Sequence, residues 1–219
     1  MDWRRRPAPV TKSDAVTTLY FIRHAQSLPL AHQAEPDWAL SPVGEAQARG
    51  LVPVLTALGL QRLYSSPYRR CRDTLAPFAA AAKLEVALVP DLRERRIAGG
   101  WISDFREVWQ RSWADLDFAL EGGETSRACR RRVVAAVDAI VARHPGETIG
   151  IGSHGNAIAL FLSHADPTFT VTDAGSIRTP EISKVTHQAG RYVWDRGFHA
   201  GPEFEALACD FRETPGVIA

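Results

Sequence analysis

Short apolar runs alternate with longer segments of helical periodicity along this chain, and this alternation limits its fold more than any other feature. The run at residues 17–22 is continuously apolar, which is typical of a strand buried on both faces of a parallel sheet. Repeated strand–helix units of this length predict an α/β fold with three layers, α/β/α, built on a parallel-dominated sheet. Strands are predicted at residues 17–22, 61–65, 84–89 and 148–152, and helices at residues 42–58, 67–82, 126–143 and 156–163.

Local signals mark where several of these elements begin and end. Ser41 can cap the first helix and Gly59 can end it, whereas Pro53 should kink or split it. Two further strands are predicted at residues 181–187 and 191–195, and the Ala-Gly pair between them predicts a β-hairpin.

Composition indicates one globular domain. The chain has 219 residues, of which 45% are hydrophobic and 23% charged, so we expect one domain at residues 17–219 after a loose arm at residues 1–16. The formal net charge of +1 gives no general attraction to nucleic acid or to a membrane surface, and no apolar stretch is long enough to span a bilayer. The three cysteines follow no metal-ligand pattern, which predicts a cytoplasmic protein with reduced thiols.

Polar side chains follow each of the four predicted parallel strands. Ligands of open α/β sheets bind beside the carboxyl ends of the strands, so we expect these side chains to meet at one edge. They are Arg23 and His24 after the first strand, Arg69, Arg70 and Arg72 after the second, Glu94 after the third and His154 after the fourth.

This set of side chains suits a phosphoryl group. Arginine forks match phosphate oxygens, a neutral histidine can act as a nucleophile, and a carboxyl group can transfer protons. Gly155 follows His154 where a helix begins, and free backbone amides at a helix start favour an anion. The clustered arginines would repel a cation, so we expect no metal at this edge.

Five short segments resemble, in order, the motifs of the histidine phosphatase superfamily, also called the phosphoglycerate mutase-like family. The segments are FIRHAQS (residues 21–27), LSPVGEAQA (40–48), YSSPYRRCRDT (64–74), LRE (92–94) and GSHGNAI (152–158). Each is short, but their shared order makes the resemblance specific. It implies the phosphoglycerate mutase-like fold with a helical lid insertion.

The resemblance also implies a mechanism that passes through phosphohistidine and needs no metal or cofactor. In it, His24 attacks phosphorus, while Glu94 protonates the departing oxygen and later activates water. Arg23, Arg70 and His154 hold the phosphoryl oxygens and stabilise the charge of the transition state. Arg70 is preferred over its neighbouring arginines because it aligns with the family motif.

The chain departs from the family pattern directly after His24. Ala25 replaces the usual Gly, and the segment SLPL at residues 27–30 lacks the Asn that many members place against phosphate. Gln26 is neutral where many members have Glu, and we include it among the candidate substrate contacts.

Residues 95–125 predict a lid insertion that is rich in aromatic side chains. Phe105, Trp109 and Trp113 are spaced by four and share one helix face, which could serve ordinary packing, a lid over the site, or both. Trp101 is a candidate substrate contact on this insertion.

Two charged residues have competing explanations. Glu124 could replace Glu94 as the acid, or could simply favour the start of the helix that follows it. Arg95 would bind a substrate carboxylate if the chain were a mutase, because LRERR resembles the mutase pattern Leu-x-Glu-Arg.

The leading hypothesis is a phosphomonoester hydrolase. The alternative is a phosphoglycerate mutase primed by a bisphosphate, although the mutase's Tyr-Gly and later Arg-Arg segments are not found here. A non-catalytic phosphate- or protein-binding module should have a broken catalytic set, whereas His24, Glu94 and His154 are all present. We expect a small phosphorylated substrate, no nucleic-acid or membrane partner, and an oligomeric state left open, with a homodimer as one option.

Overall fold

A computed structural model describes residues 15–209 of the chain and places a six-stranded sheet, in the order β3-β2-β4-β1-β5-β6, at its centre. The strands are β1 (Thr17–Arg23), β2 (Arg62–Ser65), β3 (Val86–Leu88), β4 (Thr148–Ser153), β5 (Glu181–Gln188) and β6 (Arg191–Trp194). The α-helices are α1 (Pro42–Ala57), α2 (Arg69–Ala82), α3 (Phe105–Ala114), α4 (Ser126–Arg143), α5 (Gly155–Ala165), α6 (Val171–Gly175) and α7 (Pro202–Glu205). Two short 3-10 helices are η1 (Glu35–Asp37) and η2 (Pro90–Leu92).

Parallel pairing dominates the part of the sheet that carries the strand–helix units. Strand β4 lies between β1 and β2 and pairs with both in parallel, and β2 pairs in parallel with β3. Strand β5 runs antiparallel to β1 and continues into β6 through the predicted hairpin. The carboxyl ends of β1, β2 and β4 therefore meet at one edge of the sheet.

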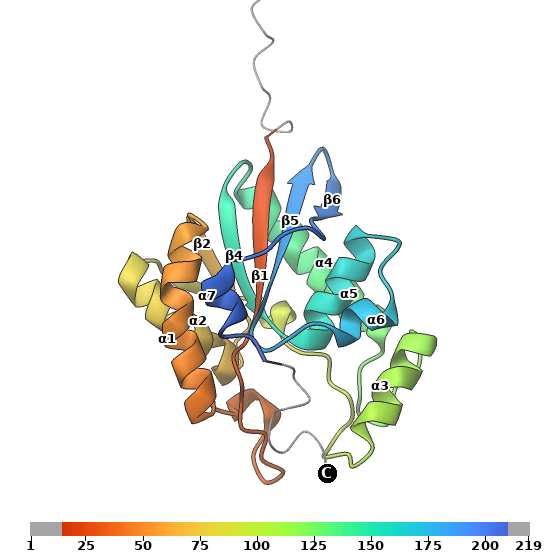
Figure 1. Ribbon diagram of the computed structural model, residues 1–219. Helices are drawn as coiled ribbons and strands as arrows, with labels where there is room; N and C mark the ends of the chain where they lie inside the picture. The colour runs from red at the N-terminus through yellow and green to blue at the C-terminus, as the bar shows by residue number, and fades with distance from the viewer. Residues whose placement is uncertain (1–14, 210–219) are drawn as a thin grey trace, which may run out of the picture.

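Both faces of the sheet are covered, which explains why β1 is apolar on both faces from Leu19 to Ile22. Leu19 and Phe21 belong to the core shared with α4 and α5, whereas Tyr20 and Ile22 belong to the core shared with α1 and α2. Figure 1 shows α1, α2 and α7 on one side of the sheet and α4, α5 and α6 on the other. This arrangement confirms the predicted α/β/α layers.

Most predicted elements are found, and of the two outcomes predicted for Pro53, a kink or a split of the helix, the split does not occur. The side chain of Ser41 accepts from the N–H of Gly44 and so caps α1, as its sequence position indicated. Pro53 neither ends nor splits α1, which continues to Ala57. Pro53 lies on the exposed face, where its missing N–H and its ring disturb no core contact.

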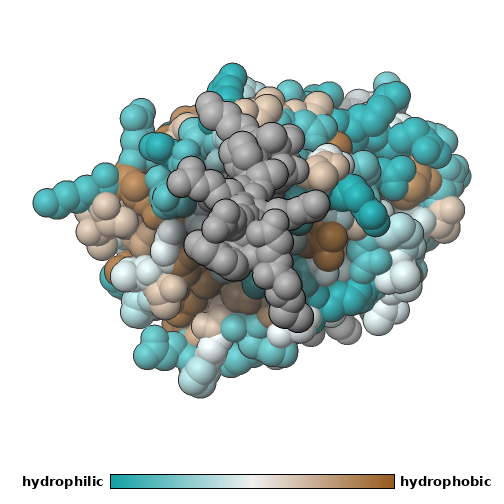
Figure 2. All heavy atoms as spheres, turned by 90° about the horizontal axis from the view of Figure 1, so that it is seen from above, coloured by the Kyte–Doolittle hydropathy of each residue, from teal (hydrophilic) through white to brown (hydrophobic). Residues whose placement is uncertain are grey.

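The remaining expectations concern the surface and the terminal arm. No helix of residues 15–209 is long and apolar enough to cross a membrane. Seen from above, the surface of the described residues is largely hydrophilic, with apolar side chains in small groups (Figure 2). Residues 1–14, which make up most of the predicted arm, lie outside the described residues.

Candidate active site

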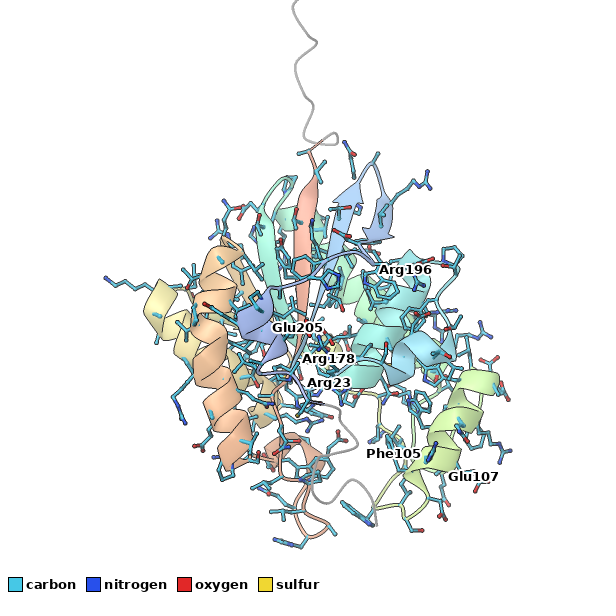
Figure 3. All side chains as sticks on the ribbon, in the orientation of Figure 1. Arg23, Phe105, Glu107, Arg178, Arg196 and Glu205 are labelled. Carbon is cyan, nitrogen blue, oxygen red and sulfur yellow. The ribbon has the colours of Figure 1, made fainter. Side chains whose placement is uncertain are left out.

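Most of the predicted site residues line a cavity of about 690 Å³ at the carboxyl edge of the sheet. Arg23 is the last residue of β1, and Figure 3 places it at this edge. Arg70 lies in the first turn of α2, His154 immediately precedes α5, and Glu94 follows η2. Arg23, His24, Arg70 and Glu94 line the cavity, whereas His154 is fully buried and is not among the lining residues. The segments after β1 and β2 and the loop after η2 therefore supply side chains to the cavity, and the segment after β4 supplies Gly155.

His24 is held by hydrogen bonds on both sides of its ring. Its Nδ1 lies 2.8 Å from the carbonyl oxygen of Ala25, which can only accept, so this nitrogen carries the proton. Its Nε2 lies 3.2 Å from Nε of Arg70, which can only donate, so Nε2 presents a lone pair. The free nitrogen of a neutral imidazole therefore points toward the arginine.

The backbone after His24 is fixed by two neighbouring helices. The N–H of Ala25 donates to Oγ1 of Thr74 on α2, and the N–H of Gln26 donates to Oε1 of Gln47 on α1. Gly44 is required here because a Cβ at that position would overlap the carbonyl oxygen of Gln26. The helix-start motif thus anchors the turn that carries the histidine.

The two residues after His24 do not take the roles that their positions suggested: Gln26 does not contact the cavity, and Ala25 does not need the conformational freedom of glycine. The side chain of Gln26 accepts from Oγ of Ser41, is 6% exposed, and lies outside the cavity lining, so the structure does not bring it to the substrate side. Ala25 is fully buried, and the described non-glycine residues with positive φ are Lys83 and Ala189. Replacing Gly by Ala at position 25 therefore strains no left-handed backbone.

Burial keeps both histidines neutral. Desolvation, reinforced by the positive charges of Arg70 and Arg23, lowers the pKa of His24 well below its usual value, although its bond to Ala25 opposes the shift. Burial followed by the charge of Arg70 lowers the pKa of His154 in the same way. The two rings lie 5.2 Å apart in an edge-on arrangement.

Arg23 packs against the start of α5 at Gly155. Its Nη1 donates to the carbonyl oxygen of Ile177 at 2.6 Å, and burial lowers the pKa of its guanidinium. A Cβ added to Gly155 would lie 3.1 Å from Cζ of Arg23. Glycine at position 155 therefore leaves the room that the arginine occupies.

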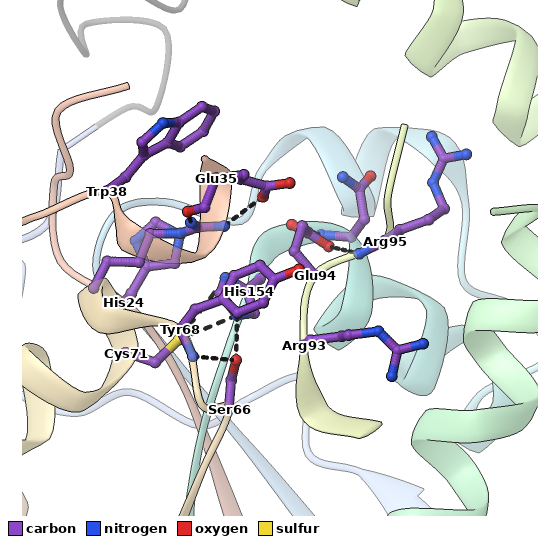
Figure 4. A network of polar contacts seen from close by, with 12 residues as sticks. His24, Glu35, Trp38, Ser66, Tyr68, Cys71, Arg93, Glu94, Arg95 and His154 are labelled. Carbon is purple, nitrogen blue, oxygen red and sulfur yellow. Dashed lines mark hydrogen bonds and ion pairs between the residues drawn. The ribbon is translucent and has the colours of Figure 1, made fainter. Parts of the chain in front are cut away.

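Arg70 is paired with a residue that the sequence patterns did not indicate, Glu35 of η1. Its Nη2 lies 2.7 Å from the carboxylate of Glu35, and its Nη1 donates to the carbonyl oxygen of the same residue at 2.8 Å. Burial raises the pKa of Glu35, although the charge of Arg70 works against the shift. Trp38 and Tyr68 flank the guanidinium, with ring centroids 5.4 and 5.0 Å away (Figure 4).

His154 is oriented by residues of the segment after β2. Its Nε2 shares a hydrogen bond of 2.8 Å with Oγ of Ser66, and Ser66 also accepts from the N–H of Tyr68. Cys71 lies 3.4 Å from the same nitrogen, and burial raises the pKa of its thiol to about 12. Ser66 and Cys71 thus position the second histidine. Both residues belong to the motif at residues 64–74, and their position in it was the only indication in the sequence that they contribute to the site.

Glu94 occupies the helix start that we expected to bind an anion directly. Its carboxylate accepts from the N–H groups of Asn156 and Ala157, both at 3.1 Å, and from its neighbour Arg95 at 2.7 Å. The amides at the start of α5 therefore hold a protein carboxylate beside the cavity. Gly155 lines the cavity next to them.

Two candidate charges are engaged elsewhere. Glu124 forms a salt bridge of 2.7 Å with Arg132 and is not among the residues that line the cavity. Arg95 lines the cavity but is 1% exposed, and its guanidinium donates to Oγ of Ser112 and to the carbonyl oxygen of Glu124.

The insertion at residues 95–125 contributes aromatic side chains to the cavity. Trp101, Phe105 and Trp109 line it, and Trp109 donates to the side chain of Asn156. Figure 3 shows Phe105 on the side of α3 that faces the sheet. Trp113 instead stacks on Phe169, outside the cavity lining, so this face of α3 contributes both to the cavity lining and to ordinary packing.

Within residues 15–209, no group of three or more His, Cys, Asp or Glu side chains is placed to hold a metal ion. Cys71, Cys129 and Cys209 are all free thiols.

Comparison with known proteins identifies the family. The family model for the histidine phosphatase superfamily, branch 1, matches residues 19–196. A probable phosphoglycerate mutase, GpmB, of Erwinia tasmaniensis is 28% identical over 193 residues, covering 80% of this chain and 87% of that protein. Phosphoserine phosphatase 1 of Hydrogenobacter thermophilus is 30% identical over 152 residues, covering 62% of this chain and 70% of its own.

Solved structures agree at the level of the fold. The complex of a mycobacterial glucosyl-3-phosphoglycerate phosphatase with inorganic phosphate has a TM-score of 0.67 at 20% identity, covering 85% of this chain and 98% of that one. The chain belongs to the histidine phosphatase superfamily, and its fold is phosphoglycerate mutase-like. It is an enzyme of the class that includes both phosphatases and mutases, as its motifs indicated.

Proposed function

We propose that this protein is a phosphomonoesterase in which Nε2 of His24 is the nucleophile. The observation that carries the proposal is the bonding of the His24 ring, which directs its lone pair into the cavity beside Arg70. Protonation of Nδ1 is set by the Ala25 carbonyl, so the ring is poised to form a bond to phosphorus.

The first chemical step transfers the phosphoryl group to the protein. The lone pair of His24 forms the N–P bond while the ester P–O bond breaks, and Glu94 gives its proton to the departing oxygen. Nε of Arg70, which donates to Nε2 of His24, turns to a phosphoryl oxygen. Arg23 and His154 stabilise the remaining charge.

The second step regenerates the protein. Glu94 removes a proton from water, the water oxygen bonds to phosphorus, and the N–P bond to His24 breaks. Inorganic phosphate leaves, and the proton on Glu94 restores the acid for the next cycle. The neutral state of His24, favoured by burial and nearby arginines, makes it both a ready nucleophile and a good leaving group.

A mutase remains the second candidate because of the similarity to the probable phosphoglycerate mutase. One observation favours hydrolysis. Arg95, the residue expected to bind the carboxylate of phosphoglycerate, is buried and already donates to Ser112 and Glu124. Freeing it would break both bonds and leave their acceptors buried.

Rapid quenching in base tests the proposal. Brief exposure to a ³²P-labelled phosphomonoester should leave an acid-labile, base-stable label on the wild-type protein and none on His24→Ala. A label on another residue would contradict the assignment. Release of inorganic phosphate without bisphosphate distinguishes the phosphatase from a mutase, which would interconvert phosphoglycerates only when primed.

A further inference from the structure

The cavity is much larger than a phosphoryl group requires, and its outer wall is aromatic. Its volume of about 690 Å³ lies within the range that accommodates ligands of drug-like size. The lining also carries five aromatic rings, from three parts of the chain: Trp38 and Tyr68, which flank Arg70, and Trp101, Phe105 and Trp109.

Two of these rings, from distant parts of the chain, meet in the cavity lining. Trp38, which follows η1, and Trp101, on the insertion, lie 6.4 Å apart at an interplanar angle of 68°. Trp101 is nevertheless 54% exposed, which leaves a large apolar face in water. An apolar group entering between the insertion and η1 would cover that face, which is favourable.

The charges of the lining fit one phosphoryl group and little more. The lining arginines are Arg23 and Arg70 at the phosphate end, Arg95, whose guanidinium is engaged, and Arg96, which is exposed. Among the described lining residues there is no lysine. Glu35 also lines the cavity, and its carboxylate would repel a second anionic group nearby.

We propose that the substrate is a phosphomonoester of an alcohol that carries an aromatic or broad apolar group and no carboxylate. This inference rests on the proposed function, since the phosphoryl group is placed beside His24. The leaving group then lies against Trp38, Trp101 and Phe105. A three-carbon phosphorylated acid would leave this wall uncovered. The exposed basic side chains of the lining that remain for its carboxylate are Arg96 and His32.

Substrates with matched leaving groups test the proposal. 2-Naphthylmethyl phosphate and ethyl phosphate both release a primary alkoxide, so their difference in kcat/KM measures binding of the apolar group. We expect kcat/KM for the naphthylmethyl ester to exceed that for ethyl phosphate, 3-phosphoglycerate and phosphoserine by about 100-fold. A kcat/KM for either carboxylated substrate that equals or exceeds it would overturn the inference.

Substitutions at the rim locate the effect. Trp101→Ala should reduce the naphthylmethyl-to-ethyl ratio of kcat/KM by about tenfold, and Trp101→Phe should restore most of it. Val193→Ala on β6 removes apolar surface from a comparably exposed side chain, 57%, outside the cavity, and should leave the ratio unchanged. If the ratio is unchanged in Trp101→Ala, the apolar group does not contact Trp101, and the proposed binding of the leaving group against this residue is wrong.

Non-hydrolysable phosphonates separate this inference from the proposed function. Wild-type protein should bind 2-naphthylmethylphosphonate about 100-fold more tightly than ethylphosphonate in calorimetry, whether or not any ester is turned over. Tight, selective binding without hydrolysis of any ester would refute the phosphatase and retain the ligand class. Hydrolysis with equal affinity for both phosphonates would refute the ligand class and retain the phosphatase.

Discussion

Replacing Gly155 by Ala should damage the site while sparing the fold. Gly155 is the first residue of α5, where Ala is the better helix former, and its φ is not positive. The added Cβ would lie 3.1 Å from Cζ and 3.3 Å from Nε and Nη2 of Arg23. The substitution therefore acts on one guanidinium and adds no backbone strain.

The expected magnitude follows from the displacement of Arg23. Carbon atoms in contact prefer a separation of about 3.5–4.0 Å, so the guanidinium must withdraw by about 0.4–0.9 Å. Its bond to the carbonyl oxygen of Ile177, already at 2.6 Å, restricts the ways in which it can move. A misplacement of about 1 Å costs on the order of 100-fold in rate, so we expect kcat/KM to fall about 10- to 100-fold.

The assay compares kcat/KM for a phosphomonoester with the unfolding midpoint in urea. Gly155→Ala should lose activity and keep its free energy of unfolding within about 0.5 kcal/mol of wild type. Gly175→Ala is a matched control because its Cβ would meet Trp109 at an ordinary 3.7 Å. Full activity in Gly155→Ala, or equal loss in both variants, would refute the assigned contact with Arg23.

Three further predictions concern charge at the site. Glu94→Gln should lower kcat/KM for alkyl phosphates about 100-fold or more but affect p-nitrophenyl phosphate much less, because nitrophenolate departs without a proton. Glu35→Gln should tighten vanadate binding about tenfold in inhibition assays, because it removes a negative charge beside Arg70 and keeps a hydrogen-bond acceptor. The pKa values of His24 and His154 are lower in the folded protein than in the unfolded chain. Below about pH 6.5 the unfolded chain therefore binds more protons at these two positions than the folded protein does. The free energy of unfolding should consequently be highest above that pH and decline below it. Urea titrations at several pH values give the free energy of unfolding as a function of pH. Below about pH 6.5 this free energy should rise with pH less steeply in His24→Asn than in wild type, by about 1.4 kcal/mol per pH unit.

Each of these predictions has its own control. Glu124→Gln breaks the salt bridge to Arg132 and should lower stability without changing the dependence on leaving group, and equal loss for all esters in Glu94→Gln would argue against proton transfer. Weaker vanadate binding in Glu35→Gln would show that the carboxylate positions Arg70 more than it competes with phosphate. If the free energy of unfolding depends on pH equally in wild type and His24→Asn between pH 5 and 6.5, the pKa of His24 is not lowered by folding.

Local patterns in the sequence determined the strands, the helices and the main polar residues. The apolar run of β1 indicated burial on two faces, and a strand–helix series can satisfy that only with helices on both sides. Because parallel strands end at one edge of the sheet, the sequence alone predicted that Arg23, His24 and His154 lie close together. Capping of α1 by Ser41 was also predictable from the sequence, because it depends only on residues that are close in the chain.

Contacts between distant segments were decided only by the tertiary structure. Glu35 pairs with Arg70 across 35 positions in the chain, and no motif marks it. Only the folded chain shows that Glu124 pairs with Arg132 and does not line the cavity. Pro53 is tolerated because it lies on the exposed face of α1. A sequence pattern reports spacing along one element, whereas the partner of a charge depends on which surfaces the folded chain brings together.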